Sequence, residues 1–183
     1  MKTIVIGERF NMPRRPHAET LLEKMLSVEP GSADRYWNLM CAYGAFHYES
    51  MRAKLRSVGV PPDAKKMNML PPAPQGDPWE KRAAETVARD WLPRLLRDYK
   101  VVFFAGGNVR RAFNLGLPST LLDEDLYGFP MQMCDRFGRF EPVVNKEGTQ
   151  AVAIPHPSGL CRWWNEPVLV DMLRHDIEGL TQC

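Results

Sequence analysis

Four short apolar runs along the chain predict the strands of a sheet. They are rich in β-branched and aromatic residues and span Lys2–Ile6, Lys66–Leu70, Val101–Ala105 and Ala151–Ile154. Continuous apolar runs of this kind are typical of strands that are buried on both faces. Gly7 is expected to end the first strand, and the Pro71-Pro72 pair the second, because glycine and proline interrupt strand pairing.

Segments with apolar residues at helical spacing separate these runs and predict helices. They span Ala18–Leu26, Ser32–Tyr43, Tyr48–Ser57, Asp77 or Pro78 to Leu96, Asn108–Leu115 and Pro167–Glu178. Pro93 is expected to kink or break the fourth helix, and residues 117–148 to form an irregular excursion with short edge strands. The alternation of strands and helices predicts one three-layer α/β/α domain over residues 1–183, with a central, mostly parallel, four-stranded sheet.

Polar groups follow three of the predicted strands, at their carboxyl ends. Gly7-Glu8-Arg9-Phe10-Asn11 is expected to form the loop after the first strand, Asn68 lies near the end of the second, and His156-Pro157-Ser158 follows the last. Ligands of parallel α/β sheets bind at the carboxyl ends of the strands. We therefore expect these three groups to converge on one site.

The residue types in these groups suit acid–base chemistry on a ligand with hydrogen-bonding edges. Glu8 is a candidate general base, Asn11 a candidate ligand for an amide or a phosphate, and Asn68 can donate and accept at once. His156, held between two prolines, is a candidate donor to a developing anion. Each group also has a structural interpretation, as a polar turn, a core asparagine or a core histidine. Three such strand ends together favour the functional interpretation.

Composition and cysteine spacing exclude several other classes of protein. The net charge is only +2, so affinity for an anionic polymer would have to come from local clusters of basic residues. The cysteines, at positions 41, 134, 161 and 183, show neither zinc-site nor disulfide-framework spacing. No apolar stretch approaches the roughly 20 residues of a membrane span, and the start of the chain does not resemble a signal peptide. We expect a cytoplasmic protein without a bound metal.

In their order along the chain, the motifs resemble those of the uracil-DNA glycosylase superfamily, in particular its small bacterial and phage members without an iron–sulfur cluster. Gly7-Glu8-Arg9-Phe10-Asn11 stands where that family has its first motif, and Lys66–Pro72 resembles the strand with the pyrimidine-reading asparagine. Phe103–Phe113 resembles its strand–glycine–helix unit, and His156-Pro157-Ser158-Gly159 its His-Pro-Ser loop. The resemblance spans nearly the whole chain.

This resemblance implies a DNA glycosylase that cleaves the N-glycosidic bond of uracil or another modified pyrimidine flipped out of DNA. Glu8, His156 and Asn11 would be catalytic, with His156 bonding the O2 atom of the leaving base. The base would be held by Gly7, Arg9, Phe10, Phe46 and Asn68, and the stacking aromatic would be Phe10 or Phe46. The DNA backbone would be held by Ser158, Gly159, Arg162 and Arg110. The resemblance implies single- or double-stranded DNA as partner, no cofactor, no membrane and a monomeric protein.

Arg9 departs from the family pattern, because several branches have Asp or Asn there to position the attacking water. This departure keeps two alternatives open. One is an enzyme that modifies a base, or transfers a group to it, in modified phage DNA. The other is a module that binds DNA or a protein without catalysis. The cysteines do not reproduce the iron–sulfur pattern, so no cluster is expected.

Overall fold

The computed structural model describes residues 1–11, 37–38, 40–41, 46, 48–73, 81–113, 138–139, 149–158 and 161–181. The expected helix over Ala18–Leu26 and nearly all of residues 117–148 lie outside these ranges. Of the expected helix over Ser32–Tyr43, residues 37–38 and 40–41 are described and are helical.

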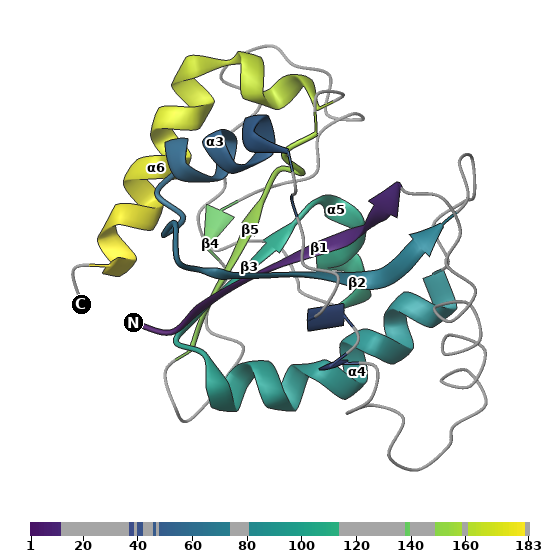
Figure 1. The fold of residues 1–183 in the computed structure, drawn as a ribbon. Coiled ribbons are helices and arrows are strands. Elements are labelled where there is room, and N and C mark those ends of the chain that lie inside the picture. The colour runs from purple at the N-terminus through teal and green to yellow at the C-terminus, as the bar shows by residue number, and fades with distance from the viewer. Residues whose placement is uncertain are drawn as a thin grey trace.

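A single sheet of five strands forms the centre of the described chain (Figure 1). The strands are β1 (Thr3–Asn11), β2 (Lys65–Ala73), β3 (Val101–Ala105), β4 (Gly138–Arg139) and β5 (Gln150–Ile154), in the order β2-β1-β3-β5-β4. The pairs β1–β2, β1–β3 and β3–β5 are parallel, which confirms the predicted four parallel strands. The two-residue β4 adds an antiparallel edge strand to that number.

Two predicted strand ends are wrong. β1 continues past Gly7 to Asn11, so the segment expected as a loop is a strand that pairs with β2, with Gly7 opposite Asn68 and Arg9 opposite Leu70. β2 likewise continues through Pro71 and Pro72. The sheet order explains the second error, because β2 is an edge strand and an edge strand tolerates residues that cannot donate a backbone hydrogen bond.

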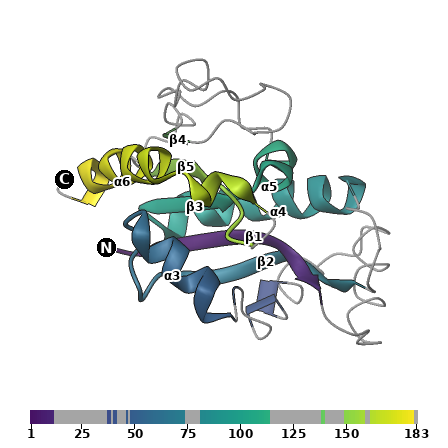
Figure 2. The ribbon, with the colours of Figure 1, turned by 90° about the horizontal axis from the view of Figure 1, so that it is seen from above.

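Helices cover both faces of the sheet. They are α3 (Glu49–Ser57), α4 (Lys81–Asp98), α5 (Gly107–Ala112) and α6 (Pro167–Thr181), with a 3₁₀ turn, η2, at Arg162–Asn165. Figure 1 shows α3 and α6 on one side of the sheet and α4 on the other, and α5 packs against α4. The view from above in Figure 2 shows the same layering. The three-layer α/β/α architecture is as predicted.

The core lies between these layers. Every residue of β3 is buried, and α4 buries a stripe four residues apart that consists of Ala83, Val87, Trp91 and Leu95. α6 buries Leu169, Leu173, Ile177 and Leu180 at the same helical spacing. α4 runs continuously past Pro93, contrary to a break there. Pro93 is exposed, so water can satisfy the carbonyl that loses its helical donor.

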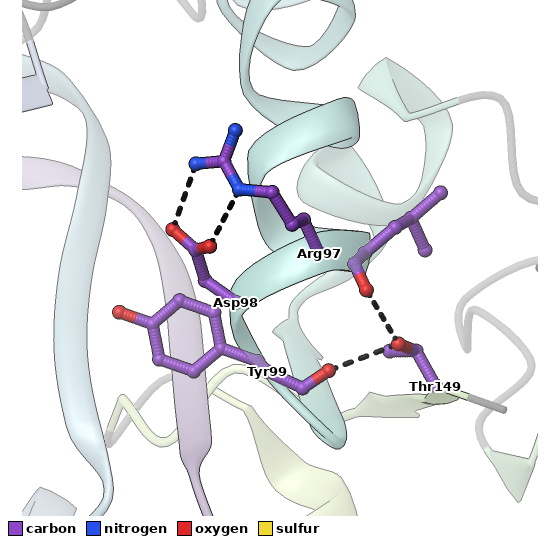
Figure 3. A network of polar contacts seen from close by, with 5 residues as sticks. Arg97, Asp98, Tyr99 and Thr149 are labelled. Carbon is purple, nitrogen blue, oxygen red and sulfur yellow. Dashed lines mark hydrogen bonds and ion pairs between the residues drawn. The ribbon is translucent and has the colours of Figure 1, made fainter. Parts of the chain in front are cut away.

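Thr149 ties the end of α4 to the start of β5 (Figure 3). Its buried hydroxyl lies 2.9 Å from the carbonyl oxygens of both Leu96 and Tyr99, so that one proton is shared between the two. The Leu96 carbonyl lies in the last turn of α4 and the Tyr99 carbonyl just after the helix, where the intrahelical hydrogen bonds run out. The neighbouring Arg97–Asp98 pair, also in Figure 3, is more exposed to solvent.

We expect Thr149→Val to lower the free energy of unfolding by about 1–3 kcal/mol, because it removes the hydroxyl that bonds the Leu96 and Tyr99 carbonyls while keeping the side-chain shape. Urea titration followed by circular dichroism measures the change. Thr149→Ser, which keeps the hydroxyl, is the matched control and should lose less. Equal losses for both variants would contradict the role given to the hydroxyl.

Candidate functional site

The carboxyl ends of β1 and β3 lie at the switch point of the sheet. The chain passes from β1 to β2 on one side and then crosses to β3 on the other side of β1. Crevices at such reversals are where open α/β sheets bind ligands. Residues towards the carboxyl ends of β1, β3 and β5 at this edge are therefore the first to consider for function.

Gly106, directly after β3, lies against the side chains of both Glu8 and His156. A β-carbon at Gly106 would lie 2.9 Å from Glu8 Oε1 and 3.3 Å from His156 Cβ, so no larger residue fits without displacing one of them. The φ angle of Gly106 is +99°, which L-residues rarely adopt. Glu8 and His156, from β1 and the loop after β5, therefore approach each other across a glycine.

Asn68 and Phe46 both lie against Gly7, the residue before Glu8. A β-carbon at Gly7 would lie 2.6 Å from Asn68 Oδ1 and 2.8 Å from Phe46 Cζ. Asn68 and Phe46 are both buried, and the Phe46 ring centroid lies 6.0 Å from that of His156. We call the group of Gly7, Glu8, Phe46, Asn68, Gly106 and His156 the strand-end site. The expected convergence of three polar strand ends thus holds for Glu8, Asn68 and His156.

Phe46 is held in a strained backbone conformation. Its φ angle is +58°, the only positive φ of a non-glycine residue in the described part of the chain. For a bulky side chain this region costs on the order of 1–2 kcal/mol. Arg52 Nε donates to the Phe46 carbonyl at 3.1 Å, which helps to hold the conformation that points the ring at Gly7 and Asn68.

The hydrogen bonds of His156 define where its proton sits. The backbone N–H of Ser158 donates to His156 Nδ1 at 3.3 Å, so Nδ1 is the acceptor and the neutral ring carries its proton on Nε2. Trp164 Nε1 donates to the His156 carbonyl at 2.9 Å. The backbone of the loop is thereby fixed, and His156 presents an N–H donor.

His156 stays neutral at physiological pH. Burial lowers the pKa of its imidazole to about 4, and the positive charge of Lys54 adds to the effect. Lys54 Nζ also donates to the Ser158 carbonyl at 3.0 Å and lies 5.8 Å from the Trp164 ring. A neutral imidazole with its proton on Nε2 can donate to a forming anion without first gaining a second proton.

Arg52, Lys54 and Trp164 support the site but were not predicted from sequence. Lys54 and Ser158 are 104 positions apart, so no local pattern could have joined them. Two tryptophans, Trp163 and Trp164, follow Arg162 in the chain. Trp163 is a buried core residue, whereas Trp164 is half-buried and bonds the loop.

The remaining predicted residues are placed less fully. Arg9, Phe10 and Asn11 belong to the end of β1, but their side chains lie outside the described part of the chain, as does Gly159. Arg110 is half-buried on α5, and its backbone N–H donates to the Gly106 carbonyl at 3.1 Å. Arg162 is exposed at the start of η2.

Among the described residues, no three His, Cys, Asp or Glu side chains are grouped so that they could hold a metal ion. No helix in the same ranges combines the length and the apolar character needed to cross a membrane.

We expect Gly106→Ala to disrupt the strand-end site. The positive φ and the 2.9 Å approach to Glu8 Oε1 should together lower the free energy of unfolding by about 1–3 kcal/mol and shift the His156 imidazole resonances. Gly59→Ala is the matched control, because Gly59 also has a positive φ, at +86°, but lies against Ile177. An unchanged His156 spectrum in Gly106→Ala would argue against the close approach.

The depressed pKa of His156 predicts a loss of stability in acid. Between the ordinary pKa of 6.5 and the folded value of about 4, the unfolded chain binds a proton that the folded chain does not. Stability should therefore fall as pH drops through this window, by roughly 3 kcal/mol in total. An NMR titration gives the pKa directly, and the difference between wild type and His156→Gln isolates this contribution. A His156 pKa near 6.5 would contradict the burial.

A scan against protein-family models matches no family, and a search of curated proteins finds no match.

Proposed function

We propose that the protein is a DNA glycosylase of the uracil-DNA glycosylase type, which hydrolyses the N-glycosidic bond of uracil or another modified pyrimidine. One observation carries the proposal: a neutral, Nε2-protonated His156 and the Glu8 carboxylate lie against the same glycine, Gly106, at the switch point, and Phe46 lies close to both His156 and Asn68. These four groups match the tasks of the reaction, which are to read a base, stack on it and stabilise it as an anion.

In this proposal His156 stabilises the leaving base. As the bond between C1′ and N1 breaks, its electron pair moves onto the base, and charge builds on the O2 atom. The Nε2–H of His156 donates to that atom, and such a preorganised donor in a water-poor site lowers the barrier. Asn68 would pair with the edge of the pyrimidine through its amide, and Phe46 would stack on the ring.

Glu8 would act on the sugar side. Its carboxylate can accept the proton of a water whose oxygen attacks C1′, and its negative charge favours the positive charge that develops on the sugar. Asn11 would assist there, and Arg9 and Phe10 would line the same side. The approach of Glu8 to Gly106 and His156 favours this role, because both ends of the breaking bond would be served from one place.

DNA would be held outside the base site. Ser158, Gly159, Arg162 and Arg110 are the proposed backbone contacts, and the exposed position of Arg162 at η2 supports its share. No cofactor is required for this hydrolysis, which we propose for a monomer in the cytoplasm.

Base release is the direct test. Oligonucleotides with uracil, hydroxymethyluracil or other modified pyrimidines are incubated with the protein, and free base is measured by mass spectrometry and abasic sites by alkaline cleavage. We expect release from at least one substrate, and His156→Ala and Asn68→Ala should each lower kcat/KM roughly 100- to 1000-fold. Arg174→Gln, an exposed change on α6, should not.

Two other outcomes of this test would indicate a different function. An altered base with its sugar bond intact would indicate a base-modifying or group-transfer enzyme instead. DNA binding that survives Glu8→Gln and His156→Ala, without free base from any substrate at stoichiometric protein, would indicate a non-catalytic binding module.

A further inference from the structure

Helix α3 presents one exposed stripe that starts beside the strand-end site. Tyr48, Arg52 and Arg56 are spaced four residues apart, so they lie on one side of the helix. All three are exposed, and Tyr48, at 70% exposure, is the most exposed of the large hydrophobic residues described. Its side chain makes no capping hydrogen bond to the helix, so the ring has no evident structural task there.

The hydrogen bonds of α3 place this stripe at the strand-end site. Arg52 Nε bonds the carbonyl of Phe46, which is part of that site, at 3.1 Å. On the same helix, Lys54 bonds the carbonyl of Ser158, two residues after His156, at 3.0 Å. Both acceptors are uncharged, so each cation keeps its full charge next to the site.

Charge is divided unevenly between the two helices on this face of the sheet (Figure 1). α3 has three cationic residues and one acidic residue, for a net charge of +2, whereas α6 has one cationic and three acidic residues, for a net charge of −2. Lys66 adds to the positive side, since the charges of Arg52 and Arg56 contribute, after burial, to its lowered pKa. The positive potential is therefore concentrated on the α3 side of the strand-end site.

We propose that the stripe of Tyr48, Arg52 and Arg56 is a binding surface for the nucleic-acid strand that flanks the nucleotide held in the strand-end site. The inference rests on the proposed function for what occupies that site. Tyr48 provides a platform on which a neighbouring unstacked base stacks, and Arg52 and Arg56 face the phosphates that follow. Alternating aromatic and cationic side chains bind single-stranded nucleic acid with little dependence on sequence.

Glu49 limits this surface in the protein as it stands. Its carboxylate pairs with Arg56, and that pairing holds the pKa of Glu49 below its usual range, so it remains charged. A phosphate must therefore compete with Glu49 for Arg56. Because of this competition, two substitutions should change the affinity in opposite directions. Removing the Glu49 carboxylate should strengthen binding, whereas removing the Arg56 guanidinium should weaken it.

The stacking part is tested by fluorescence anisotropy with a labelled single-stranded oligonucleotide of roughly 15 nucleotides. We expect Tyr48→Ala to raise Kd about tenfold or more and Tyr48→Phe to bind like wild type, since the ring and not the hydroxyl stacks. Val168→Ala, an exposed apolar change on α6, is the control and should leave Kd unchanged. An unchanged Kd for Tyr48→Ala would overturn the proposal.

The charge part uses matched pairs on the two helices. Arg56 and Arg174 have similar side-chain exposure, 47% and 45%, and each pairs with an acidic residue of its own helix. Arg56→Gln should weaken binding and reduce the slope of log K against log salt by about 0.7, the value for one lost single-strand phosphate contact, whereas Arg174→Gln should do neither. Glu49→Gln should tighten binding severalfold, and Asp171→Asn, which removes one of the two carboxylates paired with Arg174, should not.

Binding and base release separate this inference from the proposed function. Base release with a Kd that is insensitive to the α3 variants would overturn the α3 surface and leave the glycosylase proposal standing. Binding that follows the α3 variants, without release of any base, would support the surface and contradict the glycosylase. Equal effects of the α3 and α6 changes would overturn the surface, because only bulk charge would then matter.

Discussion

The strand-end site depends on position 106 being a glycine, which has no side chain. Glu8 lies in β1 and His156 follows β5, and the sheet order places β3 between these strands. Neighbouring strands lie about 4.8 Å apart, so β1 and β5 are roughly 10 Å apart and their side chains can meet only across the end of β3. Gly106 stands at that end, with a φ that suits glycine and no β-carbon to separate the carboxylate from the imidazole.

Side chains that have no part in the proposed chemistry hold the strand-end site by donating hydrogen bonds to backbone carbonyls. Trp164 and Lys54 bond the carbonyls of His156 and Ser158, and Arg52 bonds that of Phe46. The imidazole is thus oriented through its own backbone, and its ring needs only the Ser158 N–H to define the tautomer. Preorganisation of this kind leaves the reactive atoms free for a ligand.

The sequence predicted the layered fold and the three polar strand ends well, because apolar runs and parallel-sheet geometry are local and general signals. β3 was predicted to the residue at Val101–Ala105. The continuation of β1 through Gly7 and of β2 through Pro71-Pro72 was missed, since each depends on which strand lies alongside. Gly106 entered the sequence prediction only as part of the strand–glycine–helix unit at Phe103–Phe113, and Lys54 could not be found at all, because its partner lies 104 positions away.

The proline pair in β2 affects whether copies of the protein can associate through the edge of the sheet. An open sheet edge is a template onto which another chain can add a strand. β2 is the long edge of this sheet, and the opposite edge, β4, has only two residues. The two prolines remove two backbone donors from this end of β2, and its register with β1 shifts at the same place. Prolines and register irregularities are both features that protect edge strands. The end of β2 nearest the strand-end site is therefore a poor template for edge-to-edge aggregation.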